Sequence, residues 1–276
     1  MRRPVIVVLR VILLVYAGML IMLAGCQRQF IYYPSRASEQ GLLDIARGVN
    51  MEPWRDPDDR IIGWRTSSDD DETGNVMVVF HGNAGYALHR TYFSEGFKSI
   101  SRSDKWDVYI FEYPGYGARP GRPSEKAIKE AAVSAVHGLT EKGHDVYLIG
   151  ESLGGGVACY LAGKKPDDIK GLFLITPFTS LVDVGRHHYP FFPVGLLLRE
   201  RYDNLDALEN YGGPVAFMLA ERDEIIPASL GMRLYEEYDG PKKLHVQEGR
   251  THNTLMFPPG AEWWDDISAF LLESGG

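Results

Sequence analysis

One short stretch of sequence decides the fold: Gly150, Glu151, Ser152, Leu153, Gly154. It follows the apolar run Val146–Ile149 and precedes small and apolar residues that predict a helix. A bare G-x-S-x-G pattern also fits an ordinary glycine-rich turn, but a serine placed between a buried strand and a helix indicates a nucleophile elbow. Gly150 and Gly154 suit such an elbow, because strand and helix approach closely there. The pattern therefore predicts Ser152 as a nucleophile.

Apolar runs and helical patterns alternate on both sides of this stretch. Continuous rather than alternating apolarity is typical of strands buried on both faces of a sheet. A helix is predicted to begin after an N-cap at Ser124, with apolar residues on one face. This order predicts an α/β fold with a mostly parallel central sheet and helices on both faces. The expected strands are Arg60–Thr66, Val76–Phe80, Val108–Phe111, Val146–Ile149, Leu172–Ile175, Val215–Leu219 and Leu244–Val246, with a polar turn at 67–75.

A loop with small residues follows the carboxyl end of the predicted strand Val76–Phe80, where ligands bind in such sheets. Acyl transfer passes through a tetrahedral oxyanion that two fixed backbone N–H groups stabilise. We assign these two donors to Asn83 and to Leu153, the residue after the nucleophile. His81 and Gly82 support the loop, and His81 has a structural role because it precedes the serine.

The acid and the base of a triad are expected after the serine, in that order. Three acids follow the run Val215–Leu219, and the residues alone leave all three open: Glu221, Asp223 and Glu224. His252 lies in a loop after the last predicted strand, where a base can reach the serine. The other histidines after the serine fit less well. His245 falls inside that strand, and the adjacent His187 and His188 have no acid at ligand spacing, so no metal site is predicted.

With these residues in hand, the chain from about Phe30 to Leu272 resembles the α/β-hydrolase superfamily, in particular the compact branch of ABHD-type depalmitoylases and bacterial membrane-anchored hydrolases. The matching segments are Phe80–Gly85, Tyr113–Gly117 with Pro123–Glu125, Gly150–Gly156, Pro177–Ser180, Asp223–Pro227, and His252 with Asn253. The resemblance implies a triad of Ser152, Asp223 and His252 that hydrolyses an ester or thioester through an acyl-enzyme, without metal or organic cofactor. Ala118–Pro120 depart from the family, whose members often have serine there.

The resemblance also implies the outline of the catalytic domain. The connection 181–210 is too short for a large cap domain, and we expect it to form a short lid segment. Its aromatic residues are predicted either to roof the pocket or to pack in the core: Tyr189, Phe191 and Phe192. We expect a catalytic domain at 58–276 and an N-terminal extension at 26–57.

Residues 1–25 have the layout of a secretory signal, with a basic start, an apolar run and then small residues. Leu23–Cys26 resembles the lipobox of bacterial lipoproteins, which implies acylation of Cys26, and Gln27 resembles the sorting residue of outer-membrane lipoproteins. The alternative is an uncleaved inner-membrane signal anchor, although the charge-free stretch 11–25 is shorter than the roughly 20 residues of a spanning helix. Both tether the protein to a membrane, with the lipoprotein facing the periplasm or the cell exterior.

Composition excludes some classes of protein. The chain has 276 residues and 45% hydrophobic residues, as expected for one globular catalytic domain. Its formal charge is −8, and three of its positive charges lie in residues 1–25, so the remainder carries −11. Such an acidic body disfavours nucleic acid as a partner. Cys159, the only cysteine besides Cys26, is predicted as a core residue.

A small-molecule or lipid-like acyl compound is therefore the expected substrate. Two other functions remain as alternatives. A serine peptidase of the same fold would use the same triad, but the sequence contains no obvious specificity domain. A catalytically silent binding protein would be favoured by a missing triad residue, and all three are present.

Overall fold

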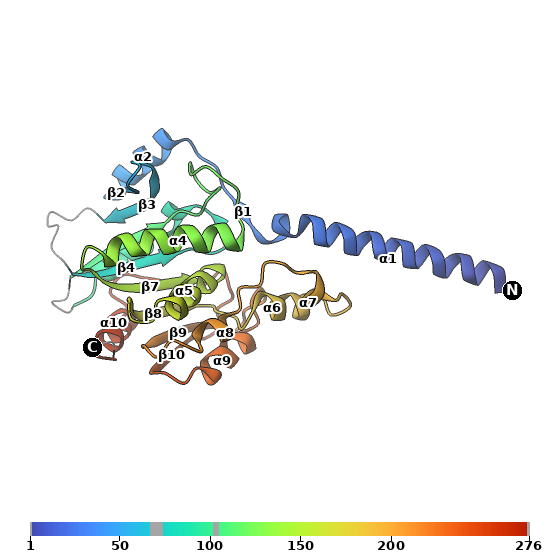
Figure 1. Ribbon diagram of the computed structural model, residues 1–276. Coiled ribbons are helices and arrows are strands. Elements are labelled where there is room, and N and C mark those ends of the chain that lie inside the picture. Colours follow the sequence, from blue (N-terminus) through green and yellow to red (C-terminus); the bar gives the residue numbers. More distant parts are fainter. Residues whose placement is uncertain (1, 67–73, 102–104, 275–276) are drawn as a thin grey trace.

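The computed structural model describes residues 2–66, 74–101 and 105–274. An eight-stranded sheet runs through its centre in the order β10-β9-β8-β7-β4-β6-β3-β2 (Figure 1). Strands β4 to β10 of this sheet pair in parallel, and β2 and β3 add an antiparallel edge. Their bounds are β2 Met51–Arg55, β3 Ile61–Thr66, β4 Asn75–Phe80, β6 Trp106–Phe111, β7 Asp145–Glu151, β8 Ile169–Ile175, β9 Val215–Ala220 and β10 Lys242–Gln247.

Helices cover both faces of the sheet, as predicted. Alternate residues of β4 show why: Val76 and Val78 enter one apolar cluster, and Met77 and Val79 enter the other. The helices and the short 3-10 turn are α1 Arg2–Ile31, α2 Glu39–Gly48, η1 Ala87–Arg90, α3 Tyr92–Lys98, α4 Glu125–Thr140, α5 Leu153–Lys164, α6 Leu181–His188, α7 Val194–Leu197, α8 Asn204–Leu208, α9 Ala228–Glu237 and α10 Glu262–Ser274. The fold is the α/β architecture predicted from the sequence.

The predicted elements agree with the structure where it describes them. All seven predicted strands are present, and the Ser124 side chain accepts the Ala127 N–H at 3.1 Å as the N-cap of α4. Of the predicted turn 67–75, residues 67–73 lie outside the described residues, and β4 begins at Asn75. Cys159 is fully buried in the core, and burial raises the pKa of its thiol, which makes it unreactive.

The edge strand β2 lies inside residues 26–57, the range predicted as an extension. It pairs with β3 along its whole length, and α2 packs against it. This strand is not apparent from the sequence. Pro53 has no N–H to donate to a neighbouring strand, and the pairing register shifts between Trp54 and Arg55. A division between residues 57 and 58 would separate two hydrogen-bonded strands. We therefore propose that the catalytic domain includes residues from at least Met51 onward.

The segment 181–210 forms three short helices, α6 to α8, and no large cap covers the sheet. The three aromatic residues singled out in the sequence take neither of the two expected positions. Tyr189 and Phe191 are exposed, and Phe192 stacks on Tyr16 of α1 with ring centroids 5.7 Å apart. Phe192 therefore meets the N-terminal helix, while other residues of the lid, among them Val184, Tyr202 and Leu208, pack in the core.

Helix α1 projects away from the sheet (Figure 1). Within the described part of the chain, its segment Pro4–Ile31 is long and apolar enough to cross a membrane, and its apolar side chains are exposed. A two-residue strand, β1 Tyr33–Pro34, follows it and pairs with β5 Ala84–Gly85 in the predicted oxyanion loop. The N-terminal helix is thus joined directly to the loop that follows β4.

Candidate active site

Ser152 lies on a sharp turn between β7 and α5. Its backbone has φ 52° and ψ −115°, which costs free energy in a residue other than glycine and is typical of strained functional turns. The turn is held by a hydrogen bond from the Ser152 N–H to the Ile175 carbonyl of β8, at 2.8 Å. Ser152 is 8% exposed. The geometry is that of a nucleophile elbow.

The two glycines of the elbow allow a close approach that a side chain would block. A Cβ at Gly150 would lie 2.5 Å from the Gly155 Cα, and one at Gly154 would overlap the carbonyl group of Phe80 at the end of β4. Gly155, by contrast, leaves ordinary van der Waals space, with the nearest atom 3.7 Å from a Cβ. Gly150 and Gly154 are therefore required by backbone contacts, as their positions in the motif predict.

We expect Gly154→Ala to destabilise the protein by about 1–3 kcal/mol, because the new methyl group must displace the backbone of β4. Gly155→Ala is the matched control. It lies one residue further along the same helix and has room, so it should leave stability unchanged or raise it by up to about 1 kcal/mol. Urea denaturation of the two variants measures both effects. Equal stability of the two variants would show that the close approach at Gly154 is not needed.

Asp223 and His252 are 29 residues apart in sequence and form a direct hydrogen bond. His252 Nδ1 lies 2.7 Å from Asp223 Oδ2, and the Asp223 side chain is only 2% exposed. The other carboxylate oxygen of Asp223 accepts the N–H groups of Ile225 and Ile226 at 2.9 and 2.7 Å. Asp223 is thereby held in one orientation, with one oxygen left for the histidine.

The two other candidate acids lie elsewhere. Glu221 accepts the N–H of Gly249 at 2.6 Å, and this bond joins the loop after β9 to the loop after β10. Glu224 is exposed to solvent. Of the three acids left open by the sequence, Asp223 is thus the one that contacts His252.

The predicted oxyanion loop is fixed by the end of the N-terminal helix. The Asn83 side chain donates to the Ile31 carbonyl at 2.9 Å, and the Asn83 carbonyl accepts both the Tyr33 N–H and the Tyr116 hydroxyl. Leu153 occupies the first position of α5, and N–H groups in a first helical turn have no partner within the helix. The loop and the helix N-terminus meet at the contact between Phe80 and Gly154.

His81 lies beneath this loop and is completely buried. Its Nδ1 is 2.7 Å from the Gly82 carbonyl, and its ring packs against that of Tyr113 in a tilted arrangement, with centroids 4.0 Å apart. Its Nε2 lies 3.6 Å from the buried carboxylate of Glu112. These contacts fit the supporting role predicted for His81.

A cleft of about 450 Å³ opens beside His252. A salt bridge that the sequence analysis did not identify lies in its wall: Arg90 contacts both oxygens of Glu151, at 2.7 and 3.0 Å. Burial alone would raise the pKa of Glu151, but the charge and hydrogen bonds of Arg90 outweigh it and hold that pKa below its usual value. The remaining lining residues are Tyr92, Ile175, Thr176, Asn253, Leu255 and Phe257. The cleft wall thus combines a paired arginine and glutamate with both polar and apolar side chains.

Known proteins are similar to this chain in sequence and in structure. Residues 75–201 match the family model of the alpha/beta hydrolase fold. An uncharacterised protein of Mycobacterium tuberculosis is 32% identical over 97% of this chain and 95% of its own length. The lysophosphatidylserine lipase ABHD12 of Danio rerio is 27% identical over 72% of this chain and 56% of its own. The Pyrococcus furiosus esterase superposes with a TM-score of 0.63 and 16% identity, over 89% of this chain and 99% of its own.

The fold and the elbow define an α/β protein of the hydrolase type. The chain belongs to the α/β-hydrolase superfamily, and its sheet and helices match that fold.

Proposed function

We propose that this protein is a serine hydrolase that cleaves a carboxylic ester or thioester through an acyl-enzyme. The observation that carries the proposal is the 2.7 Å contact between His252 Nδ1 and Asp223 Oδ2, on loops that follow neighbouring parallel strands. An acid that holds one imidazole nitrogen leaves the other free to act on a serine. Ser152 on its elbow is the nucleophile in this proposal.

The reaction follows from these roles. His252 takes the proton of the Ser152 hydroxyl as the oxygen attacks the substrate carbonyl, and Asp223 stabilises the imidazolium that forms. The backbone N–H groups of Asn83 and Leu153 stabilise the oxyanion. His252 then gives its proton to the leaving alcohol or thiol. Water activated by His252 cleaves the acyl-enzyme, and the enzyme returns to its starting state without a metal or organic cofactor.

A lipid-like acyl compound is the substrate class that we propose. Three observations support it: the apolar residues in the cleft wall, the exposed apolar helix α1, and the similarity to a lysophosphatidylserine lipase. A membrane tether keeps the enzyme at the surface where such compounds are found.

For the tether itself, we propose acylation of Cys26 after removal of residues 1–25, with the enzyme facing the periplasm or the cell exterior. Retention of α1 as an inner-membrane signal anchor is the alternative. Mass spectrometry of the mature N-terminus separates them. An acylated Cys26 supports the lipoprotein, and an unmodified chain that retains residues 1–25 refutes it.

The reaction is tested by labelling the purified protein with a fluorophosphonate and mapping the adduct. We expect one adduct, on the peptide that contains Ser152. A panel of p-nitrophenyl esters, acyl thioesters and aminopeptide substrates then assigns the reaction, and turnover of esters or thioesters without peptide cleavage is expected. Absence of any adduct together with absence of turnover would identify a binding protein instead.

A further inference from the structure

The lid segment contains an apolar loop that faces solvent. Residues 189–198 contain no charged side chain, and two of them are almost fully exposed: Phe191 in the turn after α6, at 86%, and Leu196 in α7, at 88%. Exposed aromatic and aliphatic side chains in one loop are unusual in a protein surrounded by water and mark an interaction site. The residue types do not identify the partner, but the neighbouring elements do.

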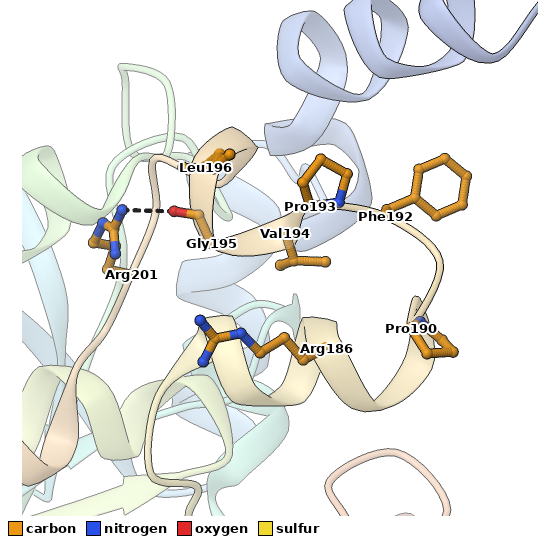
Figure 2. A pocket seen from close by; sticks show the side chains of 8 residues that line it. All are labelled: Arg186, Pro190, Phe192, Pro193, Val194, Gly195, Leu196 and Arg201. Carbon is orange, nitrogen blue, oxygen red and sulfur yellow. Dashed lines mark hydrogen bonds between the residues drawn. The ribbon is translucent and has the colours of Figure 1, made fainter. Parts of the chain in front are cut away.

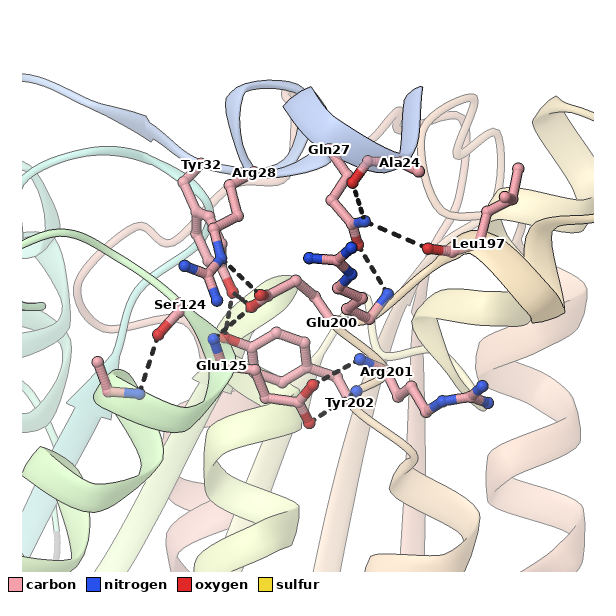
Figure 3. Close-up of polar contacts among 12 residues, drawn as sticks. Ala24, Gln27, Arg28, Tyr32, Ser124, Glu125, Leu197, Glu200, Arg201 and Tyr202 are labelled. Carbon is pink, nitrogen blue, oxygen red and sulfur yellow. Dashed lines mark hydrogen bonds and ion pairs between the residues drawn. The ribbon is translucent and has the colours of Figure 1, made fainter. Parts of the chain in front are cut away.

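A polar clamp attaches this lid to the base of the membrane anchor (Figure 3). Gln27 donates to the Leu197 carbonyl at 3.2 Å and accepts the Arg199 N–H at 2.7 Å. The buried Glu200 accepts from Arg28 at 2.8 Å and from the Tyr32 hydroxyl at 2.5 Å. The position of the lid relative to the anchor is therefore fixed.

Glu200 is charged in this clamp. Its burial would raise the pKa, but hydrogen bonds from Tyr32, from the Glu125 N–H and from Arg28 outweigh that effect and hold the pKa below its usual value. Opening the clamp would take the buried Tyr32 hydroxyl and the Arg28 guanidinium away from the Glu200 charge, so the clamp resists opening. The membrane therefore lies next to the lid with either tether, whether it holds the acylated Cys26 or the helix residues 4–25.

The loop tip extends along α1 into the region that a bilayer would occupy. Phe192 stacks on Tyr16, and the Tyr16 hydroxyl donates to the Phe191 carbonyl at 2.8 Å. Tyr16 and Gln27 are eleven residues apart, or about 16 Å of helix. The distance along the helix from Gln27 to Tyr16 is therefore about half the thickness of a bilayer's hydrocarbon core, which is roughly 30 Å. With Cys26 acylated instead, the acyl chains start one residue before Gln27 and enter the same leaflet.

Part of the backbone of this loop is paired within the protein, which lowers the cost of an environment without water, where unpaired N–H and C=O groups are costly. Pro190 and Pro193 have no N–H to satisfy. The N–H groups of Phe192 and Val194 bond within the loop at 3.1 and 2.8 Å. Where α1 is retained, the Phe191 carbonyl accepts the Tyr16 hydroxyl; in the acylated form without residues 1–25 this contact is lost.

Positive charges surround the apolar loop, although the body of the protein is acidic. Arg186, Arg199 and Arg201 flank it and are exposed. Arg186 is paired with Asp183 at 3.1 Å, whereas Arg199 and Arg201 lie on either side of the buried Glu200. A cavity of about 460 Å³ between α6 and α7 has Arg186 and Arg201 in its wall, on either side of Gly195 (Figure 2). Guanidinium groups at this level favour an anionic phospholipid surface.

We propose that the segment Tyr189–Leu196, which includes most of α7, inserts into the anionic phospholipid leaflet that holds the anchor, with Phe191 and Leu196 among the acyl chains and Arg199 and Arg201 at the phosphates. The lid is then a membrane-embedded element and not a cover over the active site. The inference rests on the proposed tether and is independent of the chemistry of Ser152.

The test uses the full chain in vesicles of phosphatidylcholine and phosphatidylglycerol whose acyl chains are brominated, because bromine quenches tryptophan on contact. Phe191→Trp adds a tryptophan at the loop tip. Ile45→Trp is the matched control, since Ile45 is also exposed (43%) but lies on α2 at the β2 edge of the sheet. We expect the fluorescence added by Phe191→Trp to fall by at least half, and that added by Ile45→Trp to stay unchanged.

The same vesicles test the charge. Arg199→Gln with Arg201→Gln should reduce the quenching at Phe191→Trp, and Arg199→Lys with Arg201→Lys should retain it. Circular dichroism checks the fold of each variant. A chain that floats with the vesicles but shows no quenching at either position overturns the insertion and leaves the tether intact. A chain that does not float overturns both. Equal quenching in all the arginine variants overturns the role of the charges.

Discussion

Ser152→Ala is expected to lower the rate of ester or thioester hydrolysis by about 10⁶-fold and to abolish fluorophosphonate labelling. The variant removes one hydroxyl group and leaves the elbow unchanged, because the turn is held by the Ser152 N–H and by the glycines on either side. The residual rate comes from the oxyanion donors and from substrate binding. Thermal unfolding should show the same midpoint for the variant and the unchanged protein.

Ser94→Ala is the matched control for this prediction. Ser94 is also buried, and its hydroxyl bonds only the Thr91 carbonyl of the preceding turn. Its labelling and turnover should match those of the unchanged protein. Strong residual labelling of Ser152→Ala would place the nucleophile at another residue and would refute the proposed triad as a whole.

The central strands of the sheet were predictable because they are buried on both faces. Runs such as Val76–Phe80 and Val215–Leu219 must be apolar throughout, and that pattern is visible without knowledge of the partner strands. The edge strand β2 has solvent on one side and contains Pro53, so its pattern does not differ from that of a loop. Local sequence therefore predicts the centre of the sheet better than its edge.

The candidate acid and base were predictable because their order along the chain limits which residues can take these roles. A base in the last loop and an acid after the preceding strand left few candidates, and the structure brings His252 and Asp223 into contact. Their catalytic roles remain predictions. The salt bridge between Arg90 and Glu151 was not predictable, since it joins residues 61 positions apart and exists only once η1 lies beside the end of β7.

The position of the lid also depends on contacts between distant segments. In the sequence, Glu200 is an acid in the connection 181–210 with no sign that it is buried. It is buried because Arg28 and Tyr32, more than 160 residues away in the chain, contact it. The aromatic residues of the lid were expected above the pocket or in the core. Their attachment to α1 follows from this clamp, which no local pattern indicates.

Asp223→Asn is expected to reduce kcat by about 10⁴-fold while the fold is kept. The substituted amide retains the oxygen that accepts the N–H groups of Ile225 and Ile226, so the loop stays in place. Its NH₂ group, however, would face His252 Nδ1 where the carboxylate oxygen now lies, and an amide nitrogen can only donate. The imidazole must then carry its proton on Nε2, the nitrogen that has to accept the proton of Ser152.

Glu224→Gln is the control, because it removes the same charge from the same loop but changes an exposed side chain. Steady-state kinetics on one soluble ester should show the loss in Asp223→Asn alone, with kcat affected far more than KM because the tautomer acts on the chemical step. A loss of similar size in Glu224→Gln, or in Glu221→Gln, together with an active Asp223→Asn, would assign the acid to a neighbour. Since Asp223 is the one of the three that contacts His252, the geometry predicts the opposite result.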